Sequence, residues 1–139
     1  MKKFIILLSI VLFGCESKST EVAAPPKAQN DVLTGLYSMT KYGSGFAPLE
    51  TFNPNDLIWQ FNAGGSLVVT INTPLASDSR VPIKLNSTVN YSLVNNNVII
   101  QGTTYSISIQ NNRLVLDSNS AADGPRIEFD KIVILKIIS

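Results

Sequence analysis

The sequence contains no histidine and a single cysteine, and these two absences exclude much of the usual chemistry of enzymes. Without histidine the chain lacks the commonest general base and metal ligand. Because Cys15 is the one thiol, no disulfide can form within the chain. Serines are plentiful, but Gly43-Ser44-Gly45 lacks the frame of a G-x-S-x-G nucleophile elbow. We therefore expect no enzymatic activity and no cofactor.

An excess of charge of either sign is also missing, since 11 lysines and arginines face 10 aspartates and glutamates. When Lys2 and Lys3 are set aside, nine basic side chains remain against ten acidic ones. A nearly neutral domain argues against nucleic acid as a partner and against a basic patch on a membrane surface.

The acidic residues near the C-terminus are the remaining candidates for catalysis or metal binding. Glu128 and Asp130 alternate with the apolar Ile127 and Phe129, which predicts that both carboxylates face solvent from the outer side of a strand. Residues 117–128 place oxygen-bearing side chains at positions 1, 3, 7 and 12 of a calcium-type loop, but Ala122 stands where that loop needs glycine. We predict a plain polar loop without a metal ion.

The N-terminus has the pattern of an export signal. Lys2 and Lys3 precede an apolar run over residues 4–13, which only Ser9 interrupts. This run is well short of the ~20 residues that a membrane-spanning helix needs, and it has the length of a signal-peptide core.

Leu12-Phe13-Gly14-Cys15 resembles the lipobox of bacterial lipoproteins, although Phe13 replaces the usual small residue. The resemblance implies a diacylglyceryl group on Cys15, cleavage before it and an acyl chain such as palmitate on the new amine. Two or more acyl chains hold a protein to a bilayer, whereas one binds reversibly. The alternative is an ordinary signal peptide, or an uncleaved anchor, in which Cys15 has no special role.

Three regions follow from these patterns. Residues 1–14 are the predicted lipoprotein signal peptide, and residues 15–30 are a lipidated tether. The tether has almost no large apolar residue and contains Pro25-Pro26, which is typical of a flexible linker with a stiffer section. Residues 31–139 are the predicted folded domain, which the N-terminal lipid would anchor to a membrane.

The domain shows the two-residue periodicity of β-strands. Residues 57–61 and 67–71 are alternating runs on either side of a glycine-rich turn, which predicts a hairpin. Residues 105–109 alternate isoleucine and tyrosine with serine, as in a strand with one buried face. Asparagine clusters at 95–97 and 111–112 are predicted turns, because asparagine tolerates a positive φ.

About eight such strands predict an all-β domain, either a small antiparallel up-and-down barrel or a flattened β-sandwich. Residues 73–82 contain two prolines and predict a longer loop or an interrupted edge strand. Ile132 and Ile134 fall on the opposite face from Ile127 and Phe129. A β-bulge near residues 130–131, or a last strand covered on both faces, would explain this change.

Leu33-Thr34-Gly35-Leu36-Tyr37 resembles the L-x-G-x-W opening of lipocalin-like domains, with Tyr37 in place of tryptophan. Further similarities are the run at 58–62 before a glycine turn, the strands of Tyr91 and Tyr105, and Ala122-Asp123-Gly124 before the last strand. Together they are similar to small lipocalin-like lipoproteins of Bacteroidota over residues 33–131. The resemblance implies an eight-stranded barrel in the cell envelope, at the periplasmic face of the outer membrane or at the cell surface.

Two hypotheses for the function follow. In the first, the barrel binds a small apolar ligand; in the second, it is an accessory envelope lipoprotein that docks onto another envelope protein and has no ligand. An internal cavity above ~300 Å³ would favour the first, and a filled interior beside exposed apolar residues would favour the second. Six side chains are predicted to converge inside the barrel as ligand contacts, or simply as core: Tyr37, Met39, Trp59, Phe61, Tyr91 and Tyr105.

Overall fold

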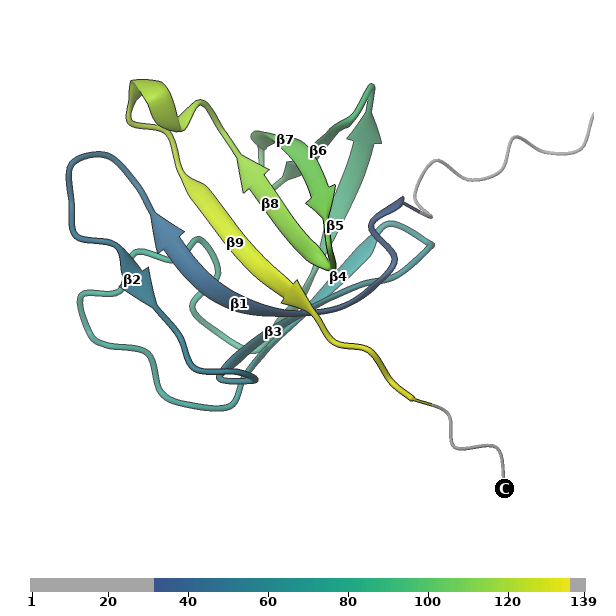
Figure 1. Ribbon diagram of the computed structural model, residues 1–139, viewed down its shortest axis with the longest axis horizontal. Helices are drawn as coiled ribbons and strands as arrows, with labels where there is room; N and C mark the ends of the chain where they lie inside the picture. Colours follow the sequence, from purple (N-terminus) through teal and green to yellow (C-terminus); the bar gives the residue numbers. More distant parts are fainter. Residues whose placement is uncertain (1–31, 136–139) are drawn as a thin grey trace, which may run out of the picture.

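A computed structural model describes residues 32–135 as a closed antiparallel β-barrel of eight strands (Figure 1). Each barrel strand pairs with the next along the chain, and the last pairs with the first, which closes the sheet. The lipocalin-like up-and-down barrel predicted from the sequence is therefore confirmed, and the sandwich is not formed. A ninth, two-residue strand pairs with the far half of the first strand. The described residues contain no α-helix.

The eight barrel strands are β1 (Gly35–Gly43), β3 (Leu57–Phe61), β4 (Ser66–Ile71), β5 (Ser87–Val94), β6 (Asn97–Ile100), β7 (Thr103–Gln110), β8 (Arg113–Asp117) and β9 (Arg126–Lys131). The additional strand is β2 (Glu50–Thr51), and a 3-10 helix, η2 (Ser120–Ala122), lies between β8 and β9.

Alternation along the strands separates the two faces of the wall. On β7, Tyr105 and Ile107 are buried inside while Ser106 and Ser108 face outward. The same pattern on the other strands fills the interior with aliphatic and aromatic side chains. Twenty such side chains are buried, seventeen of them on strands. The single cysteine of the chain can form no disulfide within it. Burial of this apolar surface is therefore the main force that holds the barrel closed.

A β-bulge lies in β1 rather than in β9. Met39 pairs with Phe129 and Lys41 pairs with Glu128, so Thr40 is an extra residue between them. The extra residue turns Tyr42 inward beside Met39, although the two are three residues apart. The prediction of a bulge near residues 130–131 is therefore wrong.

The C-terminal segment also departs from both alternatives predicted for it. The backbone N–H of Ile132 still donates to the carbonyl of Leu36, at 2.8 Å, but β9 has ended at Lys131. Beyond it, Val133, Ile134 and Leu135 are exposed. The change of face in the sequence therefore marks the point where the chain leaves the sheet, and no strand there is covered on both faces.

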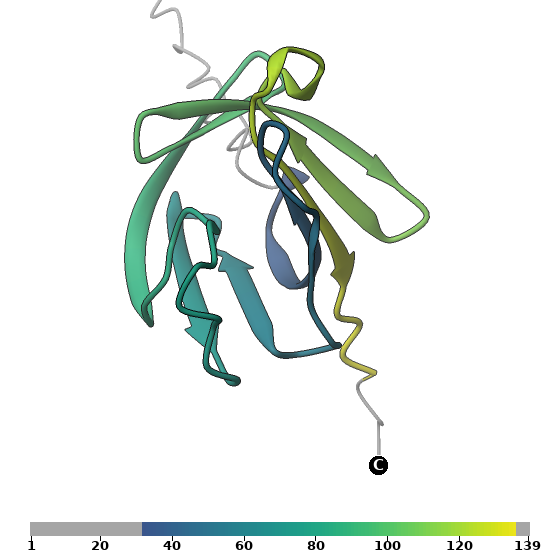
Figure 2. The same cartoon turned by 90° about the vertical axis from the view of Figure 1, so that its left-hand side faces the viewer.

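The two ends of the barrel differ in their connections. At the turn end, which contains the start of β1 and the end of β9, tight turns at residues 62–65, 95–96 and 111–112 join the strands. At the opposite loop end, one tight turn at residues 101–102 joins β6 to β7, and longer connections run over residues 44–56, 72–86 and 118–125. Figure 2 looks onto the loop end, where the segment after β4 lies in front of the strands.

Asparagines take the positive φ angles that the tight turns need. Asn95 and Asn96 have φ of 55° and 57°, and Asn111 and Asn112 have 49° and 64°. This confirms the two predicted turns, while Asn97 already belongs to β6. Residues 73–82 contain no strand, which confirms the predicted loop over the interrupted strand.

Candidate functional site

The structure brings the six predicted contact residues together on the inner face of the barrel. They come from β1, β3, β5 and β7, and none is more than 6% exposed. The placement agrees with ligand contacts and with simple core packing alike. Their relative positions and the partners of their polar atoms distinguish these two roles.

Aromatic rings form the centre of the interior. The ring of Phe61 lies 5.8 Å from that of Tyr37, 6.2 Å from Trp59 and 5.2 Å from Tyr91. Phe129 completes this aromatic cluster at 5.2 Å from Trp59 and 6.4 Å from Tyr37. The three pairs without Trp59 are edge-to-face, and each such pair contributes about 0.5–1.5 kcal/mol beyond its burial.

Two polar atoms of the cluster have no hydrogen-bond partner. The hydroxyl of Tyr91 donates to the carbonyl of Asn62 at 2.8 Å, but Tyr37 Oη and Trp59 Nε1 are buried without one. Burial also raises the pKa of Tyr37. An unpaired buried donor costs about 1–3 kcal/mol, a cost that phenylalanine at either position would not carry. The two groups are therefore poor choices for a purely structural core.

The remaining tyrosines lie further toward the loop end. Burial raises the pKa of Tyr105, and the neighbouring Tyr42 raises it further. Both side chains are at most 5% exposed. Met39, the one thioether among the six candidates, is fully buried beside them on β1.

The turn end is closed by a floor made of Leu33, Gly35, Tyr37 and Lys131. Lys131 Nζ lies 5.9 Å from the ring centroid of Tyr37, within range of a cation–π interaction. Gly35 has a φ of 147°, and a Cβ there would lie 3.3 Å from Lys131 Cε, so glycine leaves room for the lysine stem. Leu33 is fully buried just before β1.

A loop closes the other end of the barrel. Residues 72–86, the mouth loop, insert Val81 and Ile83 into the core at 1% and 5% exposure. Neither belongs to a strand, so this part of the interior is filled without ladder hydrogen bonds.

Polar contacts hold the mouth loop to β2, and we call the group of Glu50, Ser79 and Arg80 the clasp. Glu50 accepts hydrogen bonds from Ser79 Oγ at 2.6 Å and from the Arg80 backbone N–H at 2.8 Å. The Arg80 guanidinium donates to the carbonyls of Ser44 and Pro48, at 2.8 and 2.7 Å. The clasp therefore ties the mouth loop to the β1–β2 connection as well.

The larger hollows of the described surface lie outside the aromatic cluster. One of 390 Å³ lies on the outer face of β7 and β8, and one of 280 Å³ lies beside the clasp. A third, of 330 Å³, lies at the turn end and is lined in part by Phe61, Ile132 and Ile134. Of the six predicted contact residues, Phe61 alone borders these three hollows. The other five are buried among the side chains of the core.

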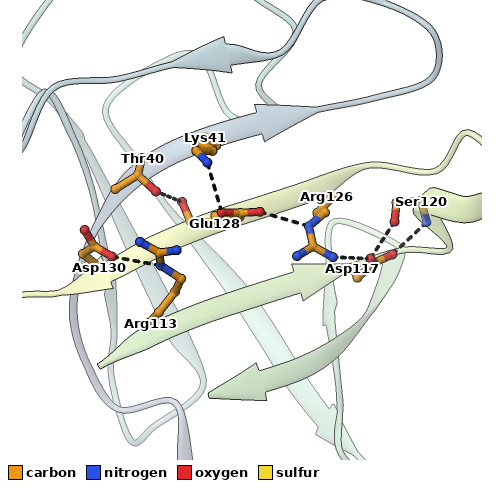
Figure 3. Close-up of polar contacts among 8 residues, drawn as sticks. All are labelled: Thr40, Lys41, Arg113, Asp117, Ser120, Arg126, Glu128 and Asp130. Carbon is orange, nitrogen blue, oxygen red and sulfur yellow. Dashed lines mark hydrogen bonds and ion pairs between the residues drawn. The ribbon is translucent and has the colours of Figure 1, made fainter. Parts of the chain in front are cut away.

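The outer face carries a row of charges along β1, β8 and β9 (Figure 3). Glu128 pairs with Lys41 at 3.9 Å and with Arg126 at 3.1 Å, while Arg126 also reaches Asp117 at 3.2 Å. Asp130 pairs separately with Arg113 at 3.4 Å. Glu128 and Asp130 therefore lie on the outer surface, as predicted.

The predicted polar loop at residues 117–128 is held by its own contacts. Asp117 accepts hydrogen bonds from the backbone N–H and the hydroxyl of Ser120, both at 2.7 Å. Burial opposes ionisation of Asp117, but these bonds and the Arg126 guanidinium outweigh it and lower the pKa. Within residues 32–135 no group of three or more Cys, Asp or Glu side chains is placed to hold a metal ion.

Comparisons with known protein families, with curated proteins and with solved structures find no match to this chain. Cys15, the predicted signal peptide and the tether lie outside the described residues. In the part of the chain that the structure describes, no helix is long and apolar enough to cross a membrane.

Sequence reasoning missed three parts of the site. Phe129 shares the inward face with Ile127, so the alternation that placed Glu128 outside also indicated an inward Phe129. Lys131 follows at the same two-residue spacing, but nothing local predicts its contact with Tyr37. The clasp joins Glu50 to Arg80 across 30 residues, and no sequence pattern marks it.

Proposed function

We propose that this protein is a lipid-anchored, lipocalin-like binding protein of the cell envelope. Its ligand is a small molecule with an apolar body and one hydrogen-bond acceptor. The observation that carries the proposal is the pair of buried, unpartnered donors, Tyr37 Oη and Trp59 Nε1, in the aromatic cluster of the interior. An acceptor on the ligand would pair with one or both donors, and the aromatic cluster would pack against the apolar body. No catalytic step is part of this proposal.

Because the interior is filled, the ligand must take the place of side chains that are inside now. Val81 and Ile83 are the candidates, since they belong to the mouth loop and can leave without breaking a strand pair. A ligand that enters there must then extend past Tyr42 and Tyr105 to reach Tyr37 and Trp59. Strands β1, β3 and β9, which hold the aromatic cluster, would keep their pairing. The bound state would therefore combine an unchanged wall with a displaced mouth loop.

Lipid on Cys15 is the anchor in this proposal, with the outer membrane as its location. Support comes from the Leu12-Phe13-Gly14-Cys15 sequence and from the absence of a competing thiol in the chain. The described chain begins at the turn end, opposite the mouth loop. A tether that leaves from that end would keep the mouth accessible.

Native mass spectrometry of the full-length protein, extracted from its own host's membranes in mild detergent, tests the ligand. We expect a reproducible adduct of one small molecule per barrel. Tyr37→Phe should lower its occupancy about fivefold to tenfold, the value of one hydrogen bond, without loss of thermal stability. Consistent absence of an adduct from the wild-type protein would refute the binding function.

Tyr91→Phe is the matched control for the ligand test. It also removes one hydroxyl from the aromatic cluster, but that hydroxyl already donates to the Asn62 carbonyl. We expect Tyr91→Phe to lower the free energy of unfolding by about 1 kcal/mol and to leave the adduct in place. The mass of the N-terminal peptide in the same preparations tests the lipid on Cys15 independently.

Docking onto an envelope protein is the second candidate, and the filled interior together with exposed apolar residues at the loop end favours it. Phe46 is 97% exposed and Leu49 is 57% exposed in the β1–β2 connection. The backbone there is tied down, because Gly45 N–H donates to the Asp123 carbonyl at 3.1 Å and Arg80 holds Ser44 and Pro48. An exposed aromatic side chain on a backbone that is held in place suits an interface anchor. Capture of one envelope protein that is lost with Phe46→Ser, without any small-molecule adduct, would favour docking.

A further inference from the structure

Exposed apolar side chains gather at the turn end of the barrel. Among the described residues nine large apolar side chains are exposed, and three of them, Phe46, Leu49 and Leu85, belong to loop-end connections. The other six lie in the last two residues of a strand at the turn end, or just outside a strand there, and we call them the rim. The rim consists of Val32, Val94, Ile109, Val133, Ile134 and Leu135.

Folding alone does not account for the rim. Val133, Ile134 and Leu135 are 60%, 71% and 84% exposed and follow one another directly after β9. Runs of three exposed apolar residues are avoided on the surfaces of soluble domains unless they bind something. Ile134 also lines the 330 Å³ hollow beside Leu36 and Phe61, so the apolar surface extends inward from the C-terminal segment to the end of β3.

The neighbouring polar groups at this end include many neutral amides. The two tight turns beside the rim consist of Asn95, Asn96, Asn111 and Asn112. Lys131 is exposed at the same end, and its Nζ lies 5.9 Å from the ring centroid of Tyr37. An apolar rim beside a lysine on a long stem is compatible with a surface that lies in the headgroup region of a bilayer. The exposed ion pair of Arg113 and Asp130 lies at the same end.

The position of the N-terminal residues points to a bilayer as the occupant of the rim. Val32 is a rim residue, and the 31 residues before it include Cys15, the proposed lipidation site. The 16 residues from 16 to 31 can span at most about 55 Å when extended, so a bilayer that holds the lipid is always within reach of this end. Tethering turns even a weak surface contact into an intramolecular one with an effective concentration in the millimolar range.

We propose that the rim lies on the surface of the same bilayer that holds the protein's own lipid anchor, with the loop end directed away from the membrane. The inference rests on the proposed lipidation of Cys15 and is independent of whether the barrel binds a ligand. It makes the floor the membrane-facing end of the molecule and the mouth loop the solvent-facing end. A second copy of the chain is the competing occupant of the rim.

The test uses the full-length lipidated protein in vesicles of phosphatidylethanolamine and phosphatidylglycerol. Because lipid blocks the thiol of Cys15, an introduced cysteine is the one thiol open to an environment-sensitive fluorophore. The fluorophore is placed at the rim by Val94→Cys and at the loop end by Phe46→Cys. We expect a blue-shifted emission and quenching by spin-labelled lipid for position 94, and neither for position 46. Equal, water-like emission at both positions would overturn the inference.

A second pair of variants shows whether the rim itself makes the contact. Val133→Ser, Ile134→Ser and Leu135→Ser together should lower the quenching at position 94 at least threefold, and folding should persist because all three side chains are exposed. Leu85→Ser, at a loop-end residue that is 75% exposed, is the control and should change nothing. A blue shift that persists without vesicles and rises with protein concentration would assign the rim to a second copy and overturn the membrane contact. A free thiol on Cys15 in the intact mass would instead show that the anchor had failed.

Discussion

The two ends of the barrel are closed in different ways. At the turn end the floor consists of strand residues and of Leu33 just before them, and the adjoining aromatic cluster packs Tyr37 against Phe61 and Phe129. At the loop end Val81 and Ile83 close the interior from the mouth loop, which the polar clasp holds in place. An end that is built into the sheet can open only if the barrel unfolds. An end closed by a loop can open locally, which is the property that a binding mouth needs.

The largest effect should come from the aromatic cluster next to the floor. Phe129→Ala removes a fully buried ring that contacts Trp59 and Tyr37, and we expect it to lower the free energy of unfolding by about 3–5 kcal/mol. Urea denaturation followed by circular dichroism measures the change. Phe46→Ala, at a ring that is 97% exposed, is the control and should stay within about 0.5 kcal/mol of wild type. Equal effects of the two variants would contradict the filled interior.

A change in the mouth loop should have a smaller and more local effect. Ile83→Ala leaves space beneath the loop, and we expect the closed state of the mouth loop to lose about 2 kcal/mol. Amide hydrogen exchange of residues 72–86 should then accelerate about 30-fold, while exchange in β1 and β3 changes little. If amide exchange accelerates equally in all strands and in the mouth loop, the two ends open as one cooperative unit, and the proposed difference between them is wrong.

Weakening the clasp should have a smaller effect again. Glu50→Gln keeps the shape of the side chain but removes the charge that pairs with Arg80, so we expect about 1 kcal/mol less stability of the closed mouth loop. Exchange of residues 79–83 should increase about fivefold. Glu128→Gln is the matched control, because Glu128 also pairs with cations but lies on the outer face. It should leave exchange in the mouth loop unchanged.

The sequence predicts the barrel wall better than its two ends, for a physical reason. Burial on one face imposes a two-residue period that can be read locally, as in Tyr105 and Ile107, and asparagine pairs mark the tight turns. The bulge at Thr40 leaves no such mark, because it depends on how β1 pairs with β9, some 90 residues away.

The candidate site follows the same division. All six inward residues could be placed from alternation, since each lies on a strand and the β1 bulge begins only after Met39. That Tyr37 and Trp59 lack hydrogen-bond partners could not be predicted, because any partner would come from elsewhere in the chain. The burial of Val81 and Ile83 is a similar case, since a loop has no period and its contacts depend on the shape of the mouth.

The smallest predicted effect is a difference in acid sensitivity between the two ends. Asp117 stabilises the start of the loop 118–125 at the loop end, and its pKa is lowered in the folded state. A carboxyl whose pKa is lower when folded contributes stability above its unfolded pKa and loses that contribution as the pH falls through its folded pKa. We expect Asp117→Asn to lower the free energy of unfolding by at most about 1 kcal/mol at pH 7, because the pair is partly exposed. This difference from wild type should shrink as the pH falls below about 4.

Thermal unfolding of both proteins between pH 7 and pH 3, with hydrogen exchange of residues 118–125 at each pH, measures the effect. In wild type we expect acid to loosen this loop before it loosens the floor, where Lys131 packs over Tyr37 and no carboxylate takes part. In Asp117→Asn, acid should not loosen residues 118–125 further before the floor. Asparagine has no charge to lose, and this loop is already loosened at pH 7. A difference between the two proteins that stays constant down to pH 3 would mean that the Asp117 contacts act through shape alone. Acid would then not distinguish the loop end from the turn end.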